Sequence, residues 1–156
     1  MQTLRAHDLP LDGHDWDRLT EIGREKNFAK RDVICSEDDP ATDYYVVLSG
    51  CVEIFKQVEG AQTPGGMPAE IRLALLEAGA SFGERCLFGG SQRTACARAY
   101  QDTALLVIDG KALATLLGQD DALAARFYRA LCVKLSNIVS DVESDLRHLH
   151  RRLTFY

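Results

Sequence analysis

The sequence lacks a long apolar run, because no segment approaches the roughly 20 consecutive apolar residues that a bilayer-spanning helix requires. Its first ten residues, MQTLRAHDLP, also lack the apolar centre of a signal peptide. Basic residues are in the minority, with 18 Lys and Arg against 23 Asp and Glu and a formal net charge of −5. A nucleic-acid-binding domain usually has a basic surface. We therefore expect a cytoplasmic protein that enters no membrane and binds no DNA directly.

Cysteine and histidine patterns that would indicate a metal site are also missing. The five cysteines form no C-x-x-C pair, and their odd number and wide spacing argue against a disulfide framework and a zinc or iron–sulfur site. Reduced, mostly buried thiols are expected, with a redox role left open for Cys86. The four histidines lie outside the predicted strands, and no nucleophile–base arrangement is found, so we expect no metal, no cofactor and no enzymatic activity. These residues are Cys35, Cys51, Cys86, Cys96 and Cys132, and His7, His14, His148 and His150.

The length and composition are those of one globular domain. A chain of 156 residues with 46% hydrophobic and 26% charged residues can bury its own core, so we assign residues 1–156 to a single domain. Apolar side chains at Trp16, Leu19 and Ile22 alternate with charged ones. This spacing predicts an N-terminal amphipathic helix over 14–26.

Residues 28–108 contain short β-rich segments separated by turn signals, a pattern typical of a sandwich or barrel. The Gly- and Pro-rich stretch 59–69 predicts a loop between two of these strands. The clearest predicted strands are Val46–Leu48, Cys51–Phe55, Ile71–Leu76, Ala95–Tyr100 and Ala104–Ile108.

Two helices are predicted after the β-rich region. Asp109 is a suitable N-cap for a short helix over 109–118, which Gly118 is expected to close. A second, longer helix is predicted from Asp120 or Asp121 to about residue 150, that is, over 120–150.

The segment 82–95, FGERCLFGGSQRTA, places Gly83 and Glu84 about ten positions before Arg93 and Thr94. Glycine lets backbone N–H groups approach a phosphate closely, and arginine offers a fork of donors for phosphate oxygens. A carboxylate accepts hydrogen bonds from sugar hydroxyls. This short segment therefore has complementary groups for both halves of a sugar phosphate.

This segment resembles the phosphate-binding cassette of the cyclic nucleotide-binding domain family, which includes catabolite-activator-type regulators and protein kinase A regulatory subunits. The similarity covers about residues 15–140 and implies a mainly β fold. The expected architecture is an eight-stranded antiparallel β-roll or jelly-roll barrel (a double-stranded β-helix) with an N-terminal helix and a long C-terminal helix. Arg31 and Asp38 replace usual glycines of the family, and these departures concern turn geometry rather than ligand binding. The matching residues are Phe82-Gly83-Glu84, Leu87 and Arg93-Thr94-Ala95.

The resemblance implies roles for the residues of 82–95. Arg93 would pair with the cyclic phosphate, and Glu84 would accept the ribose 2′-hydroxyl. In an empty site Glu84 is the expected partner of Arg93, because an unpaired buried charge is costly. Thr94 would donate its hydroxyl to the phosphate or the base. The other ligand-binding residues expected in this segment are Phe82, Gly83, Arg85, Cys86, Leu87 and Ala95.

Recognition of the base is expected from two walls. One is the strand segment with Ile71 and Leu73, and the other is the C-terminal helix. Ile138 and Val139 fall where some family members have hydroxyl residues, which argues against adenine-specific contacts. The polar candidates on the helix are Asn137, Ser136 and Ser140.

An apolar seam follows the C-terminal helix with steps of 4, 3, 4, 4, 3 and 4 residues, a near-heptad pattern. By the resemblance, its first half covers the ligand pocket and its later half pairs with a second subunit. Packing of the whole seam on the domain's own core is the alternative. The seam consists of Leu131, Leu135, Ile138, Val142, Leu146, Leu149 and Leu153.

The resemblance implies a sensor of a cyclic nucleotide, cAMP or cGMP, that signals through movement of its C-terminal helix to a dimer mate or an unidentified effector protein. The family's transcription regulators have a helix-turn-helix after this helix, whereas the present sequence stops at Tyr156, so direct DNA binding is not expected. Two alternatives stay open. One is a degenerate domain that binds no nucleotide and serves as an interaction scaffold, and the other is a sensor of a cyclic dinucleotide.

Overall fold

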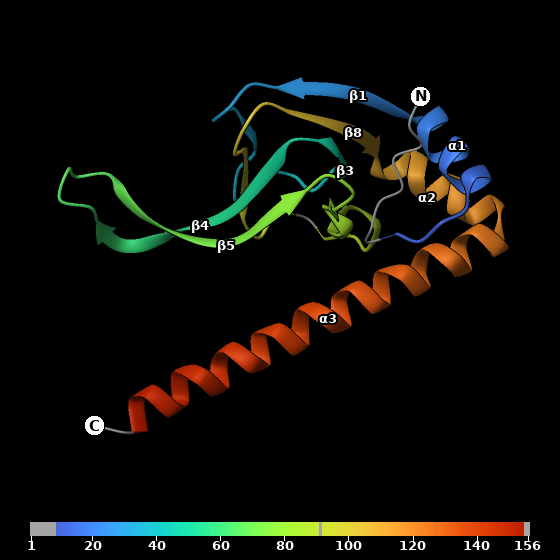
Figure 1. Cartoon of the computed structure of the whole chain (residues 1–156). Helices are drawn as coiled ribbons and strands as arrows, with labels where there is room; N and C mark the ends of the chain where they lie inside the picture. Colours follow the sequence, from blue (N-terminus) through green and yellow to red (C-terminus); the bar gives the residue numbers. More distant parts are fainter. Residues whose placement is uncertain (1–8, 91, 155–156) are drawn as a thin grey trace.

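The protein is seen in a computed structural model that describes residues 9–90 and 92–154 (Figure 1). Within these residues, eight strands form two four-stranded antiparallel sheets, in the orders β1-β8-β3-β6 and β2-β7-β4-β5. Neighbouring strands are often far apart in the sequence, as in a jelly roll. The predicted mainly β fold class is therefore confirmed. The strands are β1 (Gly23–Phe28), β2 (Val33–Cys35), β3 (Asp43–Ser49), β4 (Cys51–Gln62), β5 (Pro68–Glu77), β6 (Ser81–Phe82), β7 (Cys96–Ala99) and β8 (Thr103–Asp109).

Strand β3 is buried on both faces, which explains its continuous run of apolar residues. Successive side chains of a strand point to opposite faces. Tyr44 and Val46 belong to a core cluster shared with the helices, whereas Tyr45 and Val47 belong to a second cluster between the two sheets. This second cluster fills the interior of the jelly roll and forms the floor on which the candidate site is built.

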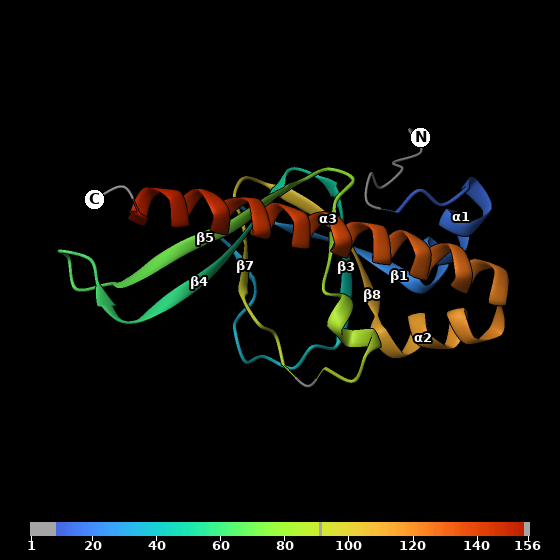
Figure 2. The ribbon, with the colours of Figure 1, turned by 90° about the horizontal axis from the view of Figure 1, so that it is seen from below.

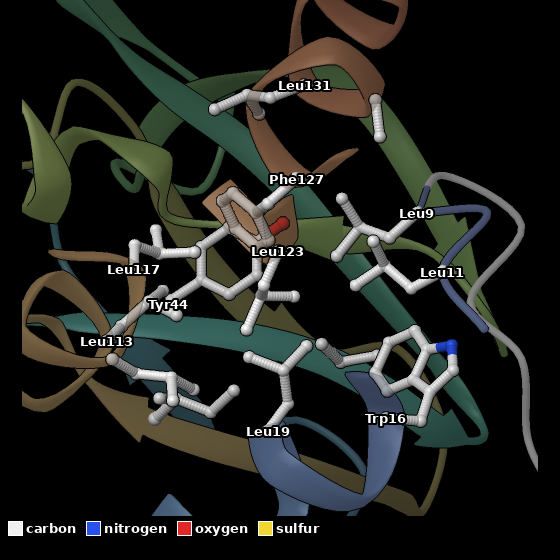
Figure 3. Packing of buried hydrophobic residues seen from close by; sticks show 14 of the residues in the cluster. Leu9, Leu11, Trp16, Leu19, Tyr44, Leu113, Leu117, Leu123, Phe127 and Leu131 are labelled. Carbon is white, nitrogen blue, oxygen red and sulfur yellow. The ribbon is translucent and has the colours of Figure 1, made fainter. Parts of the chain in front are cut away.

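The helices are α1 (Gly13–Ile22), α2 (Gly110–Gln119) and α3 (Asp121–Thr154), with a short 3₁₀ helix η1 (Glu84–Leu87) after β6. Helices α1, α2 and the first turns of α3 gather at one end of the molecule (Figure 1). Figure 3 shows their apolar side chains meeting around Tyr44, whose ring centroid lies 5.7 Å from that of Phe127. None of the described helices is both long and apolar enough to cross a membrane.

Helix α1 is shorter than the predicted helix 14–26, because residues 23–26 belong to strand β1. Strand β1 pairs with β8 over six residue pairs, from Gly23 with Ile108 to Phe28 with Thr103. The pairing begins at Gly23, where a Cβ atom would lie 2.6 Å from Cδ1 of Leu106. A glycine here therefore lets the chain turn out of the helix and pack closely on β8.

The predicted loop 59–69 is mostly strand, which corrects that prediction. Strand β4 ends only at Gln62, and β5 already begins at Pro68. These two residues pair with each other in the ladder. The connection is thus reduced to residues 63–67. The two strands form a hairpin that projects beyond the rest of the sheet (Figure 1). Glycine and proline content predicted a break here, but cross-strand pairing extends the ladder through most of it.

Helix α2 corresponds to the predicted helix 109–118, and the Asp109 side chain accepts a hydrogen bond from the Ala112 N–H at 2.9 Å. Gly118 lies inside this helix instead of closing it, which corrects the prediction. The turn occurs at Asp120, whose backbone is extended. Its side chain accepts from the Leu123 N–H at 2.9 Å and so caps the start of α3.

Helix α3 has 34 residues and extends toward the same end of the molecule as the β4–β5 hairpin (Figure 2), but Figure 1 shows the two diverging along the later turns of the helix. Its start is fixed to α1, because the Asp15 carboxylate accepts two hydrogen bonds from Arg126, at 2.6 and 2.7 Å. Arg18 forms a second ion pair with Asp120. Hydrogen bonding to the Arg126 guanidinium lowers the pKa of Asp15 below its usual value of 3.8.

The apolar residues of α3 form two rows, not the single seam predicted from the sequence. Leu131 is 2% exposed in the core, and Ile138 faces the barrel, so both belong to the inner row. The second row lies on the outer face of the helix and contains Val139 instead of Ile138. Its residues follow one another at steps of 4, 3, 4, 3 and 4, a regular heptad pattern. The described outer row is exposed and consists of Tyr128, Cys132, Leu135, Val139, Val142 and Leu146. The predicted members Leu149 and Leu153 lie outside the described side chains.

Candidate functional site

The candidate site is a pocket of about 220 Å³ at the open side of the jelly roll, between the cassette, β4, β5 and α3. One end of the pocket is made by the segment around β6 and η1 and by the residues just before β7. Its opposite walls come from the second sheet and from α3. The lining residues are Cys35, Ile54, Ala74, Leu76, Ser81, Phe82, Gly83, Glu84, Arg85, Arg93, Thr94, Ala95, Ala97, Lys134 and Ile138.

Gly83 is at the turn from β6 into η1 with φ +90°, a conformation that other residues rarely adopt. A Cβ atom at this position would lie 2.7 Å from the Asp43 carbonyl oxygen and 2.8 Å from Nη1 of Arg93. Both separations are too short for a carbon atom. The glycine therefore allows the cassette backbone, β3 and the Arg93 guanidinium to meet at one point.

Arg93 is 7% exposed and presents its guanidinium to the pocket. Its Nη2 donates to the Asp43 carbonyl oxygen at 2.7 Å, and its Cζ lies 5.2 Å from the centroid of the Tyr45 ring. Among the described residues, the buried Nε atom has no hydrogen-bond partner. A buried donor without a partner is costly. The Arg93 guanidinium can therefore offer its positive charge and its Nε–H donor to an anionic ligand.

The backbone of Arg93 is hydrogen-bonded to a turn that contains Asp38, one of the two residues that stand where the family usually has glycine. Its N–H donates to the Asp39 carbonyl at 2.8 Å, and its own carbonyl accepts from the Asp38 N–H at 3.0 Å. Asp38 has φ +68° and Arg31 has φ +77°. Both positions thus keep the left-handed backbone that glycine favours, so the replacements have not altered these turns.

The predicted ion pair between Glu84 and Arg93 is wrong. The cation that lies near Glu84 is Lys134, whose Nζ is 3.9 Å from Oε2, and no ion pair of Arg93 is found among the described residues. Arg93 is stabilised instead by a backbone carbonyl and an aromatic ring. Its charge is therefore not cancelled by a carboxylate before a ligand arrives.

Lys134 is a site residue that sequence reasoning missed. Its side chain is 11% exposed, and its ammonium group donates to the carbonyl oxygen of Ser81 and, at 3.3 Å, to the Ser81 hydroxyl. It therefore reaches from α3 to β6 and to the carboxylate of Glu84. Its spacing from Ala130 and Ile138, four residues on each side, is the signal that could have placed it on the inner face of the helix.

Most of the predicted cassette residues do line the pocket. Cys86 and Leu87 do not, because they pack against the helical core cluster instead. A Cβ atom on Gly110 of α2 would lie 2.8 Å from Cβ of Cys86. Burial raises the pKa of the Cys86 thiol to about 11 although the Arg93 charge opposes this shift, so the thiol is protonated at neutral pH. This finding disfavours the redox role left open for Cys86, since the thiolate is the reactive form.

The predicted base walls need correction. Ile71 and Leu73 are 55% and 54% exposed and do not line the pocket. The ladder shifts register between Ile54, which pairs with Ala74, and Phe55, which pairs with Arg72. This bulge leaves Leu73 unpaired, and Ala74 and Leu76 face the pocket instead. Leu73 and Leu75 alternate with Ala74 and Leu76 along the strand and are exposed on its other face.

Asn137 lies in a neighbouring groove and not in the pocket. This groove, of about 600 Å³, runs between α3 and β5 and shares Leu76, Lys134 and Ile138 with the pocket. The pocket and this larger groove are therefore neighbours that share part of their lining. The remaining residues of the groove are Pro10, Arg126, Arg129, Ala130, Val133, Asn137 and Asp141.

The family described as "Cyclic nucleotide-binding domain" matches residues 25–120, more than half of the chain. The chain belongs to this family. The match includes the whole cassette and both sheets from β2 onward.

Solved structures agree with this assignment. The N-terminal domain of a transcriptional regulator from Streptomyces coelicolor A3(2) is 27% identical with a TM-score of 0.70, over 88% of this chain and 94% of that one. The catabolite activator protein of Thermus thermophilus is also 27% identical with a TM-score of 0.70, over 89% of this chain and 61% of that one. The chain thus spans less than two thirds of the Thermus protein.

A third structure is that of CLP from Xanthomonas campestris, described as a c-di-GMP responsive global regulator. It is 23% identical with a TM-score of 0.77, over 89% of this chain and 65% of that one. At this identity the likeness concerns the fold. In this chain the inner row of α3 and the cassette line the same pocket.

Proposed function

We propose that this domain is a non-catalytic sensor that binds a cyclic nucleotide, with cAMP and cGMP as the first candidates. The carrying observation is Arg93, a buried guanidinium at the pocket wall with an Nε donor that lacks a partner among the described residues and no ion pair there with a carboxylate. A cyclic phosphate monoanion supplies both the charge and the acceptor oxygens. Glu84 would accept the ribose 2′-hydroxyl across the same pocket.

The signal would leave through α3. Lys134 and Ile138 touch the pocket from the inner row, while the outer row, including Val139 and Val142, is exposed. A regular heptad of apolar residues favours pairing with another helix. We infer that the outer row pairs with a second copy of this chain, and that ligand contacts on the inner row bias the position of the helix before an effector protein is engaged.

Titration calorimetry with cAMP and cGMP tests the sensor. Wild-type protein is expected to bind one of them saturably, and Arg93→Ala to weaken binding by at least about 30-fold, since truncating one partner of a buried charge pair costs about 2 to 5 kcal/mol. Arg24→Ala, which removes an exposed arginine from β1, is the matched control and should bind normally. No binding by folded, ligand-free protein would contradict the proposal and favour the interaction scaffold.

A cyclic dinucleotide is the second candidate, and the groove beside the pocket favours it. The pocket of about 220 Å³ is small, whereas the adjoining groove of about 600 Å³ offers room for a second nucleotide. Arg129 on the groove wall could face its second phosphate. The same fold in CLP, described as c-di-GMP responsive, is consistent with this use. A parallel titration with c-di-GMP, with Arg129→Ala as the variant, separates the two candidates.

A further inference from the structure

The walls of the pocket differ sharply in polarity. All of its charged groups apart from one belong to the segment 81–95, which consists of the cassette and the preceding Ser81. Outside this segment, the described lining residues are apolar or weakly polar except for Lys134 on α3. A ligand whose phosphate and ribose are held by the cassette turns its base toward these outer walls. Lys134 is then the strongest hydrogen-bonding side chain that the base can meet there. The other outer lining residues are Cys35, Ile54, Ala74, Leu76, Ala97 and Ile138.

Lys134 is also placed at the right end of the pocket. Its Nζ lies 3.9 Å from Oε2 of Glu84, the carboxylate expected to accept the ribose 2′-hydroxyl. The base leaves the ribose at the neighbouring carbon, so it extends past the ammonium group. The side chain is held by Ser81 and is 11% exposed, which keeps the ammonium inside the pocket instead of in solvent. A buried ammonium gains from every acceptor it meets.

An ammonium group is a donor only and has no acceptor atom. Guanine presents two acceptors, N7 and O6, on one edge, whereas adenine presents the N7 acceptor beside the N6 amino donor. A donor-only group in this position stabilises guanine and is repelled by the adenine amino group. We propose that Lys134 makes this domain selective for a guanine cyclic nucleotide, with the ammonium donating to the N7 and O6 edge. The inference rests on the sensor function proposed above.

Guanine occurs in two ligands that fit this description, cGMP and c-di-GMP. Titration with cGMP, cAMP, c-di-GMP and c-di-AMP therefore tests selectivity for the base and size of the ligand together. The wild-type protein is expected to bind the guanine member of one pair about 10-fold more tightly than its adenine counterpart. The pair in which binding occurs identifies the mononucleotide or the dinucleotide as the ligand.

Lys134→Met, which keeps the length of the side chain and removes its charge, is expected to bring the guanine-to-adenine ratio close to one. Lys111→Met, on an exposed position of α2, is the control and should keep the wild-type ratio. A second measurement uses 7-deaza-cGMP, or its dinucleotide counterpart, in which N7 is replaced by CH. This change should weaken binding to the wild type by several fold and leave binding to Lys134→Met nearly unaltered.

The outcomes separate this inference from the sensor function. A wild type that prefers adenine nucleotides, or a Lys134→Met variant that keeps the full guanine preference, overturns the role of Lys134 while the sensor function stands. A wild type that binds none of the four nucleotides overturns both. Should Lys134→Met fail to fold, the wild-type ratio and the 7-deaza ligand still decide, because neither measurement needs the variant.

Discussion

Gly83 is the residue on which the geometry of the cassette depends most directly. Its φ is +90°, and a Cβ atom on it would lie only 2.7 Å from the Asp43 carbonyl oxygen, so there is no room for a side chain. We expect Gly83→Ala to displace the cassette backbone or the Arg93 guanidinium and to weaken nucleotide binding by at least about 5-fold, with a strain of about 1 to 3 kcal/mol. Calorimetric titration of the folded variant measures this effect.

Gly118→Ala is the matched control for this substitution. Gly118 lies inside α2, and a Cβ atom there would have no neighbour within 4 Å. The change should raise the free energy of unfolding by about 0.5 to 1 kcal/mol, as alanine favours helix, without altering affinity. Normal binding by Gly83→Ala would show that the cassette tolerates a side chain and would contradict the packing described above.

Residue spacing predicted most of the cassette, but only where chemistry and sequence neighbourhood coincide. Gly83, Glu84 and Arg93 could be identified because a phosphate site needs these types of residue in one short segment. Lys134 could not be assigned in the same way, because its role depends on which face of a long helix meets the barrel. Leu73 was misplaced because β5 has apolar residues on both faces, and the sequence does not show that Ala74 and Leu76 face the pocket while Leu73 and Leu75 are exposed.

At the scale of elements, pairing and packing decided the boundaries that local propensity did not. The segment 23–26 continues a helical charge pattern, yet it forms β1 since β8 offers an unpaired edge. The hairpin of β4 and β5 crosses a Gly- and Pro-rich stretch because the ladder continues on both sides. The order of helices and strands could be read from periodicity, while their ends depend on partners distant in the sequence.

The junction of α1 and α3 gives a prediction on pH. Asp15 is 1% exposed at its side chain and accepts two hydrogen bonds from Arg126, which lower the pKa of Asp15 below 3.8. A carboxylate whose pKa is lower in the folded state stabilises the fold fully above its unfolded value and loses this effect as the pH falls through the folded value. The Asp15→Asn variant should therefore unfold at a lower urea concentration than the wild type at pH 7. The difference between the two urea midpoints should shrink below pH 3.8.

Urea unfolding followed by circular dichroism at pH 7 and near pH 2.5 measures this gap. Asp17→Asn changes an exposed carboxylate of the same helix and serves as the control. An equal difference between wild type and Asp15→Asn at both pH values would mean that the charge of Asp15 contributes nothing to the stability of the fold.

At the scale of the whole molecule, α3 presents one row to the barrel and another to solvent. An exposed apolar row of this length favours burial against a partner, and we expect the isolated chain to form dimers through it. The double variant Val139→Glu, Val142→Glu should be monomeric in sedimentation equilibrium, because its glutamates would face the same glutamates on the partner helix. Ser140→Glu, on the same stretch but outside the row, should leave the dimer intact.

A wild-type chain that stays monomeric at high concentration would contradict pairing through the outer row. A dimer that survives both glutamates would indicate a different surface. Either result leaves the pocket and the role of Arg93 unaffected, because the inner and outer rows share no residue.

The two rows of α3 also fix a phase relation between the site and the outer surface. Each residue of a helix turns the chain by about 100° and advances it by about 1.5 Å. One alanine inserted after Ser136 would leave Lys134 at the pocket yet rotate Val139 and all later residues away from their original direction. Seven inserted residues would restore that direction to within about 20°. The proposed communication between ligand and partner would therefore depend on rotational register, which point substitutions on either row leave unchanged.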